Sequence, residues 1–292
     1  MPGLIVIGFD GSEIARATLG YVARRTPPGD RMIVAHVLAI PVAMLESPYY
    51  DRAVQRSREL GEHVLDEAKG ALSPETHADM RMVEGPPARA LVELAREVGA
   101  DEIAVGSRGF GSFRAAALGS TSHALLHETD RPVLVMPGRA VERELRLAAS
   151  ASADAQPPMV VVGYDGSDNA RAALDYAAKR ADAAGGRVLA VCAFYAPAGW
   201  LGSPYYQLAL DEYQERAGEI TRGLEDRPDV ETDIVMGPPV EALTRAAQAR
   251  NAAEIVVGTR GLGRFRAALG SVSHGLLNEA DRPVVIIPAA RS

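Results

Sequence analysis

The stretch DEIAVGSRGFGSFRAAALGSTSHALLHE, residues 101–128, passes from an apolar run through a glycine-rich loop into a helix-like pattern. The run EIAV is short and apolar, and the loop bounds it, as is typical of a buried strand. The loop contains glycine and serine but no lysine, and Gly119-Ser120 comes directly before the helical pattern. A chain that leaves a strand and restarts as a helix in this way gathers backbone N–H groups at one point, which favours an anion site.

The same pattern returns as AEIVVGTRGLGRFRAALGSVSHGLLNE at residues 253–279. Further matched pairs are 4–25 with 160–180, 47–50 with 203–206, 84–95 with 236–247, and 130–137 with 281–288. Corresponding residues lie 151 to 156 positions apart, so the repeating unit is a whole domain. The segment between the copies is small, polar and proline-containing, which is typical of a linker. We therefore predict one domain over residues 1–138, a linker over 139–157 and a second domain over 158–292.

Short apolar runs alternate with helical patterns in each copy. In the first copy we predict five strands, LIVIGF, MIVAHVL, HADMRMV, EIAVG and PVLVMP, and helices over 13–25, 51–70, 87–98 and 120–128. Ser12 is expected to cap the first helix, and Pro87 suits the first turn of the third. Most strands are continuously apolar, as in parallel sheets covered on both faces, whereas HADMRMV alternates and is expected near an edge. The predicted fold is α/β, with two tandem, doubly wound, five-stranded parallel sheets.

Composition excludes several classes of protein. The formal net charge of −7 disfavours nucleic-acid binding, and no apolar run is long enough to span a membrane. The first residues, MPGLIVIGFDGS, lack the basic region of a signal peptide. The single cysteine, Cys192, has no partner for an internal disulfide and is expected to be buried. These features predict a cytoplasmic protein.

Doubly wound sheets bind ligands beyond the carboxyl ends of their strands, where the strand order reverses. If strands 1 and 4 are neighbours, the loops that follow them face one crevice. Glycine lets the backbone approach a ligand, and a helix N-terminus supplies unpaired N–H donors suited to phosphate. The candidate residues of the first copy are Asp10, Gly11, Ser12, Gly106, Arg108, Gly109, Gly119, Ser120, Thr121 and Ser122. Those of the second copy are Asp165, Gly166, Ser167, Gly258, Arg260, Gly261, Gly270, Ser271, Val272 and Ser273.

Other site chemistries are not indicated. The loop lacks the Gly-Lys-Ser/Thr of a P-loop, and no G-x-G-x-x-G follows the first strand. His123 and His127 are four residues apart, but they lack the glutamate of a zinc motif, and Asn278 takes the place of His127 in the second copy. No metal site is predicted, and no repeated serine, histidine and acid set suggests a nucleophilic triad.

The chain resembles a tandem universal stress protein of the nucleotide-binding branch. The family motif G-2x-G-9x-G-S/T matches Gly106, Gly109, Gly119 and Ser120 with its spacing intact, and the aspartate that closes strand 1 matches Asp10. The resemblance covers nearly the whole chain apart from the linker. It implies a Rossmann-like fold of the adenine nucleotide alpha hydrolase-like type.

The resemblance also implies roles for residues. Asp10 is expected at the adenine and ribose end, the backbone of Val37 at the adenine edge, and the motif glycines with Ser120 at the ribose and phosphates. Ala193 takes the place of Val37 in the second copy. Family members usually pair their last strands across a two-fold axis, so PVLVMP and PVVIIP are expected to form a pseudo-dimer within the chain, with a homodimer as a further option.

The second copy departs from the motif at one place. Eight residues separate Gly261 from Gly270, whereas nine separate Gly109 from Gly119. A shorter loop is expected to shift the helix start by more than the roughly 0.5 Å that a well-formed site tolerates. We therefore expect the second domain to bind nucleotide more weakly.

The predicted function is a cytoplasmic, ATP-binding stress-response protein that acts as a nucleotide-dependent regulatory switch. Mg²⁺ is expected to accompany the phosphates, hydrolysis is expected to be slow or absent, and a protein partner of unknown identity reads the switch. Three alternatives stay open: a sensor of AMP or cyclic AMP, a nucleotide-free scaffold that binds partners, and an enzyme such as an ATPase or nucleotidyl transferase. The missing lysine in the phosphate loop counts against the enzyme.

Overall fold

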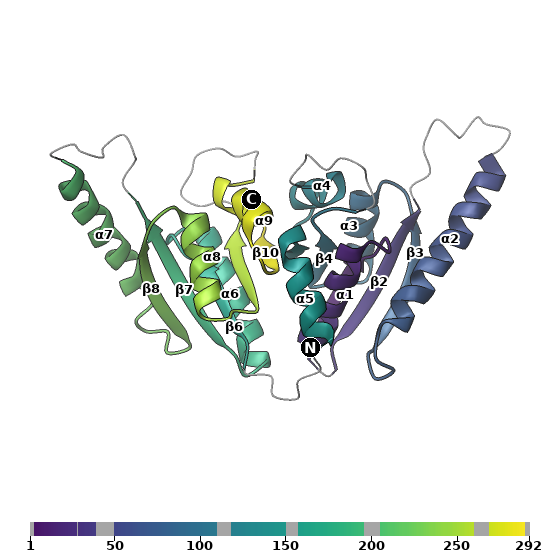
Figure 1. Ribbon diagram of the computed structural model, residues 1–292, viewed down its shortest axis with the longest axis horizontal. Helices are drawn as coiled ribbons and strands as arrows, with labels where there is room; N and C mark the ends of the chain where they lie inside the picture. The colour runs from purple at the N-terminus through teal and green to yellow at the C-terminus, as the bar shows by residue number, and fades with distance from the viewer. Residues whose placement is uncertain are drawn as a thin grey trace. The chain divides into compact units, whose positions relative to one another are not determined.

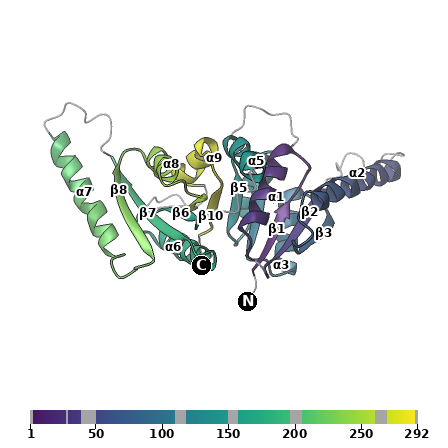
Figure 2. The ribbon, with the colours of Figure 1, turned by 60° about the horizontal axis from the view of Figure 1, so that its bottom comes forward.

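The computed structural model describes residues 3–27, 29–38, 50–109, 118–149, 157–195, 205–259 and 269–289. The chain divides into two compact units, residues 1–151 and 152–292. Each unit holds a parallel sheet with helices on both faces, as Figures 1 and 2 show. The predicted fold class is therefore confirmed.

The first unit follows the predicted order of elements. Its strands are β1 (Leu4–Gly8), β2 (Arg31–Leu38), β3 (Ala78–Glu84), β4 (Glu102–Gly106) and β5 (Val133–Met136). Its helices are α1 (Glu13–Arg25), α2 (Tyr50–Gly70), α3 (Pro87–Glu97), α4 (Ser120–Glu128) and α5 (Val141–Ala149), with a 3-10 turn at Gly138–Ala140. The strands lie in the order β3-β2-β1-β4-β5, and each neighbouring pair is parallel. Strands β1 and β4 are neighbours, as predicted, and the strand order reverses between them.

The second unit repeats this arrangement. Its strands are β6 (Met159–Gly163), β7 (Arg187–Phe194), β8 (Val230–Met236), β9 (Glu254–Gly258) and β10 (Val284–Ile287). Its helices are α6 (Asp168–Ala183), α7 (Tyr206–Arg222), α8 (Pro239–Ala249) and α9 (Ser271–Glu279). The strands lie in the order β8-β7-β6-β9-β10, again with parallel neighbours, so β6 and β9 flank the reversal point.

The middle strands of each sheet form the core. Val6 and Ile7 of β1 and all four residues of β5 have no exposed surface. In Figure 2, α1 and α5 lie on one side of the first sheet and α3 on the other, which explains why these strands are apolar without alternation. Strand β3, by contrast, alternates between half-buried and exposed residues and forms an edge of the sheet, as predicted. The exposed pair Arg31 and Asp79, 2.7 Å apart, places charge on that edge.

The segment predicted to begin the linker forms a packed helix. Helix α5 packs against α1 within the first unit. Glu144 of α5 is 1% exposed, and its Oε2 accepts a hydrogen bond from Arg24 Nη2 at 2.6 Å. A second ion pair joins the same carboxylate to Arg143. Burial raises the pKa of Glu144, and the two guanidinium groups act in the opposite direction.

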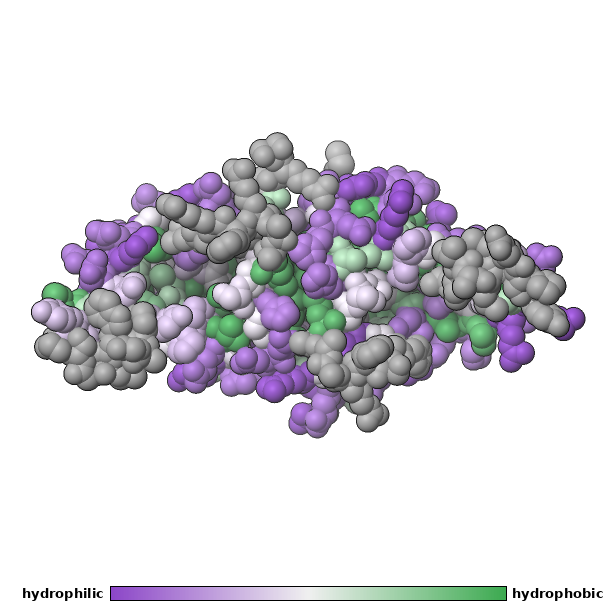
Figure 3. Space-filling model, turned by 90° about the horizontal axis from the view of Figure 1, so that it is seen from above, coloured by the Kyte–Doolittle hydropathy of each residue, from purple (hydrophilic) through white to green (hydrophobic). Residues whose placement is uncertain are grey.

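Hydrophilic residues are widespread on the face shown in Figure 3, and hydrophobic residues appear there in smaller areas. Within the described ranges, no helix is both long and apolar enough to cross a membrane. Cys192 is a free, buried thiol in β7, as the sequence predicts.

Candidate functional site

Two loops of the first unit leave the same edge of the sheet. Strands β1 and β4 pair in parallel, with Ile7 opposite Ala104. The chain therefore passes from β1 into Asp10 and from β4 into Ser107 at neighbouring points. This adjacency brings the glycine-rich loop and the first-strand aspartate together, although they are far apart in the sequence.

The turn after β1 is fixed by its own hydrogen bonds. Asp10 Oδ1 accepts from the Ser12 N–H at 3.0 Å, and Gly11 has a φ of 81°, a left-handed conformation that favours glycine. Ser12 Oγ accepts from the Ala15 N–H at 3.3 Å and caps α1, as predicted. Gly11 and Ser12 thus shape the turn and the helix start, and neither lines the cavity described below.

The start of α4 differs from the start of α1. Gly119 is the N-cap of α4, and no side chain caps the helix. The first amides of an α-helix have no partner within the helix, so an uncapped start presents donors and a partial positive charge. The Gly119 N–H itself donates to Ser107 O at 2.6 Å, which ties the helix start to the end of β4.

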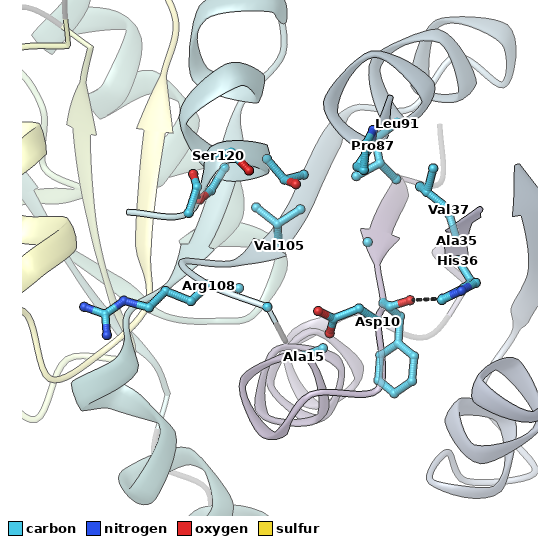
Figure 4. Close-up of a pocket in the computed structure, with 17 residues that line it drawn as sticks. Asp10, Ala15, Ala35, His36, Val37, Pro87, Leu91, Val105, Arg108 and Ser120 are labelled. Carbon is cyan, nitrogen blue, oxygen red and sulfur yellow. Dashed lines mark hydrogen bonds between the residues drawn. The ribbon is translucent and has the colours of Figure 1, made fainter. Parts of the chain in front are cut away.

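A cavity lies where these two loops and the end of β2 meet (Figure 4). Nine of the predicted residues line it: Asp10, Val37, Gly106, Arg108, Gly109, Gly119, Ser120, Thr121 and Ser122. Eight further lining residues were not predicted: Gly8, Phe9, Ala15, Ala35, His36, Pro87, Leu91 and Val105. Most of these eight residues are apolar, and they lie beside the predicted residues on the same strands or in the first turns of α3. Their proximity to the strand ends is the signal that could have found them.

The cavity has an apolar wall and a polar wall. Figure 4 shows Val37, Pro87 and Leu91 gathered on one side and Ser120 on the other, with Asp10 at the base. The side chain of Arg108 extends away from Asp10 in this view, and the residue is exposed. Such a combination of an apolar face with a few convergent polar groups is typical of a small-molecule site.

His36 joins two of the strand ends that form the cavity. Its Nδ1 lies 2.9 Å from Phe9 O, and because a carbonyl oxygen only accepts, Nδ1 carries the proton of this bond. The Phe9 N–H in turn donates to Ala35 O at 2.8 Å. The residue before Asp10 is therefore bonded to the strand that carries Val37.

Ser122 lines the cavity, but its hydroxyl bonds to the backbone. Its hydroxyl is 3.0 Å from Ser107 O and 3.1 Å from Gly119 O, and the residue is 1% exposed. The single hydroxyl proton is thus directed at backbone carbonyls. Ser120 is exposed and stays a candidate donor to a ligand.

The second unit repeats the turn and the cap. Asp165 Oδ1 accepts from the Ser167 N–H at 3.0 Å, Gly166 has a φ of 79°, and Ser167 caps α6. Gly258 ends β9, and Gly270 is the N-cap of α9, which also lacks a side-chain cap. Ser271, Val272 and Ser273 form the first turn of α9, and Ala193 lies near the end of β7. Arg260 and Gly261 lie outside the described residues.

The shorter loop of the second unit does not shift the helix start in the expected way. The Gly270 N–H donates to Thr259 O at 2.7 Å, which matches the 2.6 Å bond from Gly119 to Ser107 O. The N-cap backbone angles also match: φ −62° and ψ 154° at Gly270, φ −70° and ψ 157° at Gly119. The physical reason is that, in each unit, this hydrogen bond ties the end of the loop to its beginning and so sets the helix start. The missing residue therefore leaves the geometry of the helix start unchanged.

Two of the substitutions in the second unit remove a polar side chain of the first. Val272 occupies the position of Thr121 and removes a hydroxyl from the first turn. Cys192 occupies the position of His36. Burial raises the pKa of the Cys192 thiol, and the carboxylate of Asp165 adds to the effect.

The model of the universal stress protein family matches residues 1–137 and 159–288, which together make up most of the chain. The chain belongs to the universal stress protein family. A universal stress protein of Thermus aquaticus is 36% identical over 132 residues, 44% of this chain and 96% of its own length. A universal stress protein of Mycolicibacterium smegmatis is 27% identical over 298 residues and aligns with 97% of this chain and 96% of its own length.

A solved structure shows the same fold over the full length. The crystal structure of a universal stress protein from Archaeoglobus fulgidus has a TM-score of 0.67 and 22% identity, and covers 98% of both chains. The Thermus protein matches a length equal to one unit, whereas the Mycolicibacterium and Archaeoglobus proteins match the tandem arrangement. The resemblance to a tandem universal stress protein is therefore confirmed.

Proposed function

We propose that the first unit binds an adenine nucleotide, with ATP as the first candidate, and that the bound nucleotide acts as a regulatory switch. The observation that carries the proposal is the uncapped start of α4 directly beside Asp10 and the loop after β4. Unpaired amides at a helix start suit phosphate, and the apolar wall of Val37, Pro87 and Leu91 suits a flat base.

The residues present fit a phosphorylated ligand. Gly109 and Gly119 lack side chains where the loop and helix start line the cavity, so their backbone is accessible at close range. A Cβ atom at Gly119 would lie 3.1 Å from Ser107 O, closer than ordinary contacts allow. Among the lining residues that the structure describes, Asp10 is the only carboxylate, which makes it the candidate ligand for Mg²⁺ carried by the phosphates.

The switch is proposed to turn over slowly or not at all. The lining residues include one acid and one histidine, and the Nδ1 proton of that histidine, His36, is directed at Phe9 O. No lysine lines the cavity to neutralise a transferring phosphoryl group. Binding then acts by shifting a conformational population that a partner protein reads, in the cytoplasm.

The test identifies the nucleotide that copurifies with untagged protein. The protein is denatured, and the released small molecules are identified and quantified per chain. We expect ATP at about one to two molecules per chain. AMP or cyclic AMP in its place would support the sensor, and no nucleotide, with none bound on adding ATP, would support the scaffold.

Variants separate these outcomes from simple unfolding. Asp10→Ala is expected to lower ATP affinity by about tenfold or more while the circular dichroism spectrum is kept. Asp79→Ala removes an exposed carboxylate on the edge strand β3 and is the matched control. Equal affinity in the Asp10→Ala and Asp79→Ala chains would contradict the proposed site.

The assembly stays a prediction. We propose that the last strands of the two domains pair within the chain as a pseudo-dimer, with a homodimer as a further state. Light scattering of the purified chain at several concentrations measures the mass directly. A concentration-independent mass equal to one chain would support a pseudo-dimer without further association.

A further inference from the structure

The hydroxyl of Ser122 connects the end of β4 to the first turn of α4. Its Oγ lies 3.0 Å from the carbonyl oxygen of Ser107 and 3.1 Å from that of Gly119. Ser107 O also accepts the Gly119 N–H at 2.6 Å. One carbonyl after the strand is thus held by both the N-cap residue and the third residue of the helix.

The second unit builds a corresponding connection, but its serine bonds most closely to Gly258, the last residue of β9, one position before the counterpart of Ser107. Ser273 Oγ lies 2.9 Å from Gly258 O and 3.4 Å from Thr259 O, and the residue is 2% exposed. Thr259 O accepts the Gly270 N–H at 2.7 Å. Between the second and third motif glycines, the first unit has nine residues and the second has eight. The bond from the N-cap glycine is therefore kept, and a helix serine still bonds to the strand end, although the carbonyl closest to it and the loop length differ.

We propose that Ser122 and Ser273 are positioning residues that fix the phosphate-binding helix start to the strand end, independently of the loop between them. The inference rests on the proposed nucleotide function. It assigns the two serines a role distinct from that of Ser120 and Ser271, which are exposed at the helix start. It also implies that both units present a formed phosphate-binding end, contrary to the weaker second site expected from loop length.

The proposed role follows from how little a phosphate site tolerates displacement of its hydrogen-bond donors. Hydrogen bonds to a phosphate group require the donors to be held within about 0.5 Å of the productive geometry. Among the residues that the structure describes, two hydrogen bonds join the helix start to Ser107 O. Without the serine hydroxyl, only the bond from the Gly119 N–H remains. The first turn of α4 then gains freedom at the phosphate end, whereas the apolar wall at the other end of the cavity is unchanged.

The experiment compares ATP with adenosine, which lacks phosphate. Ser122→Ala is made in full-length chains that also carry Asp165→Ala, so that the second site is weakened and the first site is resolved from it by isothermal titration. We expect ATP affinity to fall by about tenfold and adenosine affinity to stay the same. Ser273→Ala in chains carrying Asp10→Ala is expected to show the same ATP-specific loss at the second site.

Thr18→Ala is the matched control. Thr18 of α1 is also buried and its hydroxyl donates to a backbone carbonyl, Ile14 O at 2.7 Å, but it does not line the cavity. Its loss is expected to lower the free energy of unfolding without changing the ratio of ATP to adenosine affinity. A purely structural role for Ser122 would give the same result as this control.

The outcomes are distinguishable. If the starting chain binds ATP and Ser122→Ala binds ATP equally well, or loses ATP and adenosine affinity in parallel, the positioning role is wrong while the proposed function stands. If the unmutated chain binds neither ATP nor adenosine, the proposed function is wrong and the positioning role is overturned with it.

Discussion

The carboxylate of Asp10 lies directly against Gly109, so that a Cβ atom added to Gly109 would overlap Asp10 Oδ2. The two residues follow different strands, β1 and β4, and both line the cavity. Glycine at this position therefore accommodates the close approach of the aspartate, which would have to move for a larger residue. The second glycine of the family motif and the strand-1 aspartate are therefore in direct contact, and the size of one limits the position of the other.

Gly109→Ala is predicted to lower ATP affinity by about tenfold, because the methyl group forces Asp10 or the loop to move. Gly138→Ala is the control, since an added Cβ there meets no atom within 4 Å. Titration of ATP measures both variants. In an Asp10→Ala background the Gly109→Ala change is expected to have little further effect, because the clashing carboxylate is gone. A full additional loss in that background would show that the clash is not the cause.

The carboxylate of Glu144 is predicted to make stability depend on pH. Burial raises its pKa in the folded chain, so the folded state holds the proton more tightly than the unfolded state. The stabilisation from this group is then greatest below the ordinary glutamate pKa and is lost as the pH rises through the folded value. Urea unfolding of the unmutated chain and Glu144→Gln at pH 4 and pH 7 measures this. We expect the stability of the unmutated chain, relative to the variant, to be higher at pH 4, and the reverse order would contradict it.

Arg282 is predicted to stabilise the end of α8. Its Nη1 donates to Ala247 O at 2.6 Å and Ala252 O at 2.7 Å, and the residue is 3% exposed. Arg282→Lys replaces a planar guanidinium, whose Nη1 reaches both carbonyls while Nε donates to Asp281 at 2.9 Å, by one ammonium group, so the free energy of unfolding is expected to fall by about 2 kcal/mol. Arg250→Lys, in an exposed ion pair with Glu231, is the control and is expected to change stability by less than about 0.5 kcal/mol. Equal effects in urea unfolding would rule out this role.

Cys192 is predicted to resist alkylation in the folded chain. Burial raises the pKa of its thiol and shields it, so both the thiolate fraction and the access of reagent are low. Iodoacetamide at pH 8 is expected to modify the native protein at least about a hundredfold more slowly than the urea-unfolded protein, followed by mass spectrometry. Comparable rates would mean that β7 opens readily.

Periodicity and turn chemistry predicted the elements of the first unit closely. The helices predicted over 13–25 and 120–128 match α1 and α4, and Ser12 and Pro87 occupy the positions predicted for a cap and a first turn. These features are local, because capping and apolar periodicity depend on residues within a few positions of each other. The helix α5 was not predicted as a packed element because its docking depends on α1, far away in the sequence.

The candidate site was partly predictable. Its motif residues carry a recognisable spacing, and nine of the residues predicted for the first copy line one cavity. His36 and the rest of the apolar wall beyond Val37 carried no such signal, because Pro87 and Leu91 look like ordinary helix residues until α3 is placed beside β1 and β2.

The sequence by itself determined the repeat, the order of strands and helices, and the family, because these follow from local patterns and motif spacing. Only the tertiary structure decided what Ser122 bonds to and that a loop one residue shorter still starts α9 in the same geometry. It also decided that Asp10 and Gly109 meet. Each of these depends on hydrogen bonds and contacts between segments that parallel strand pairing brings together, and spacing along the chain does not encode those distances.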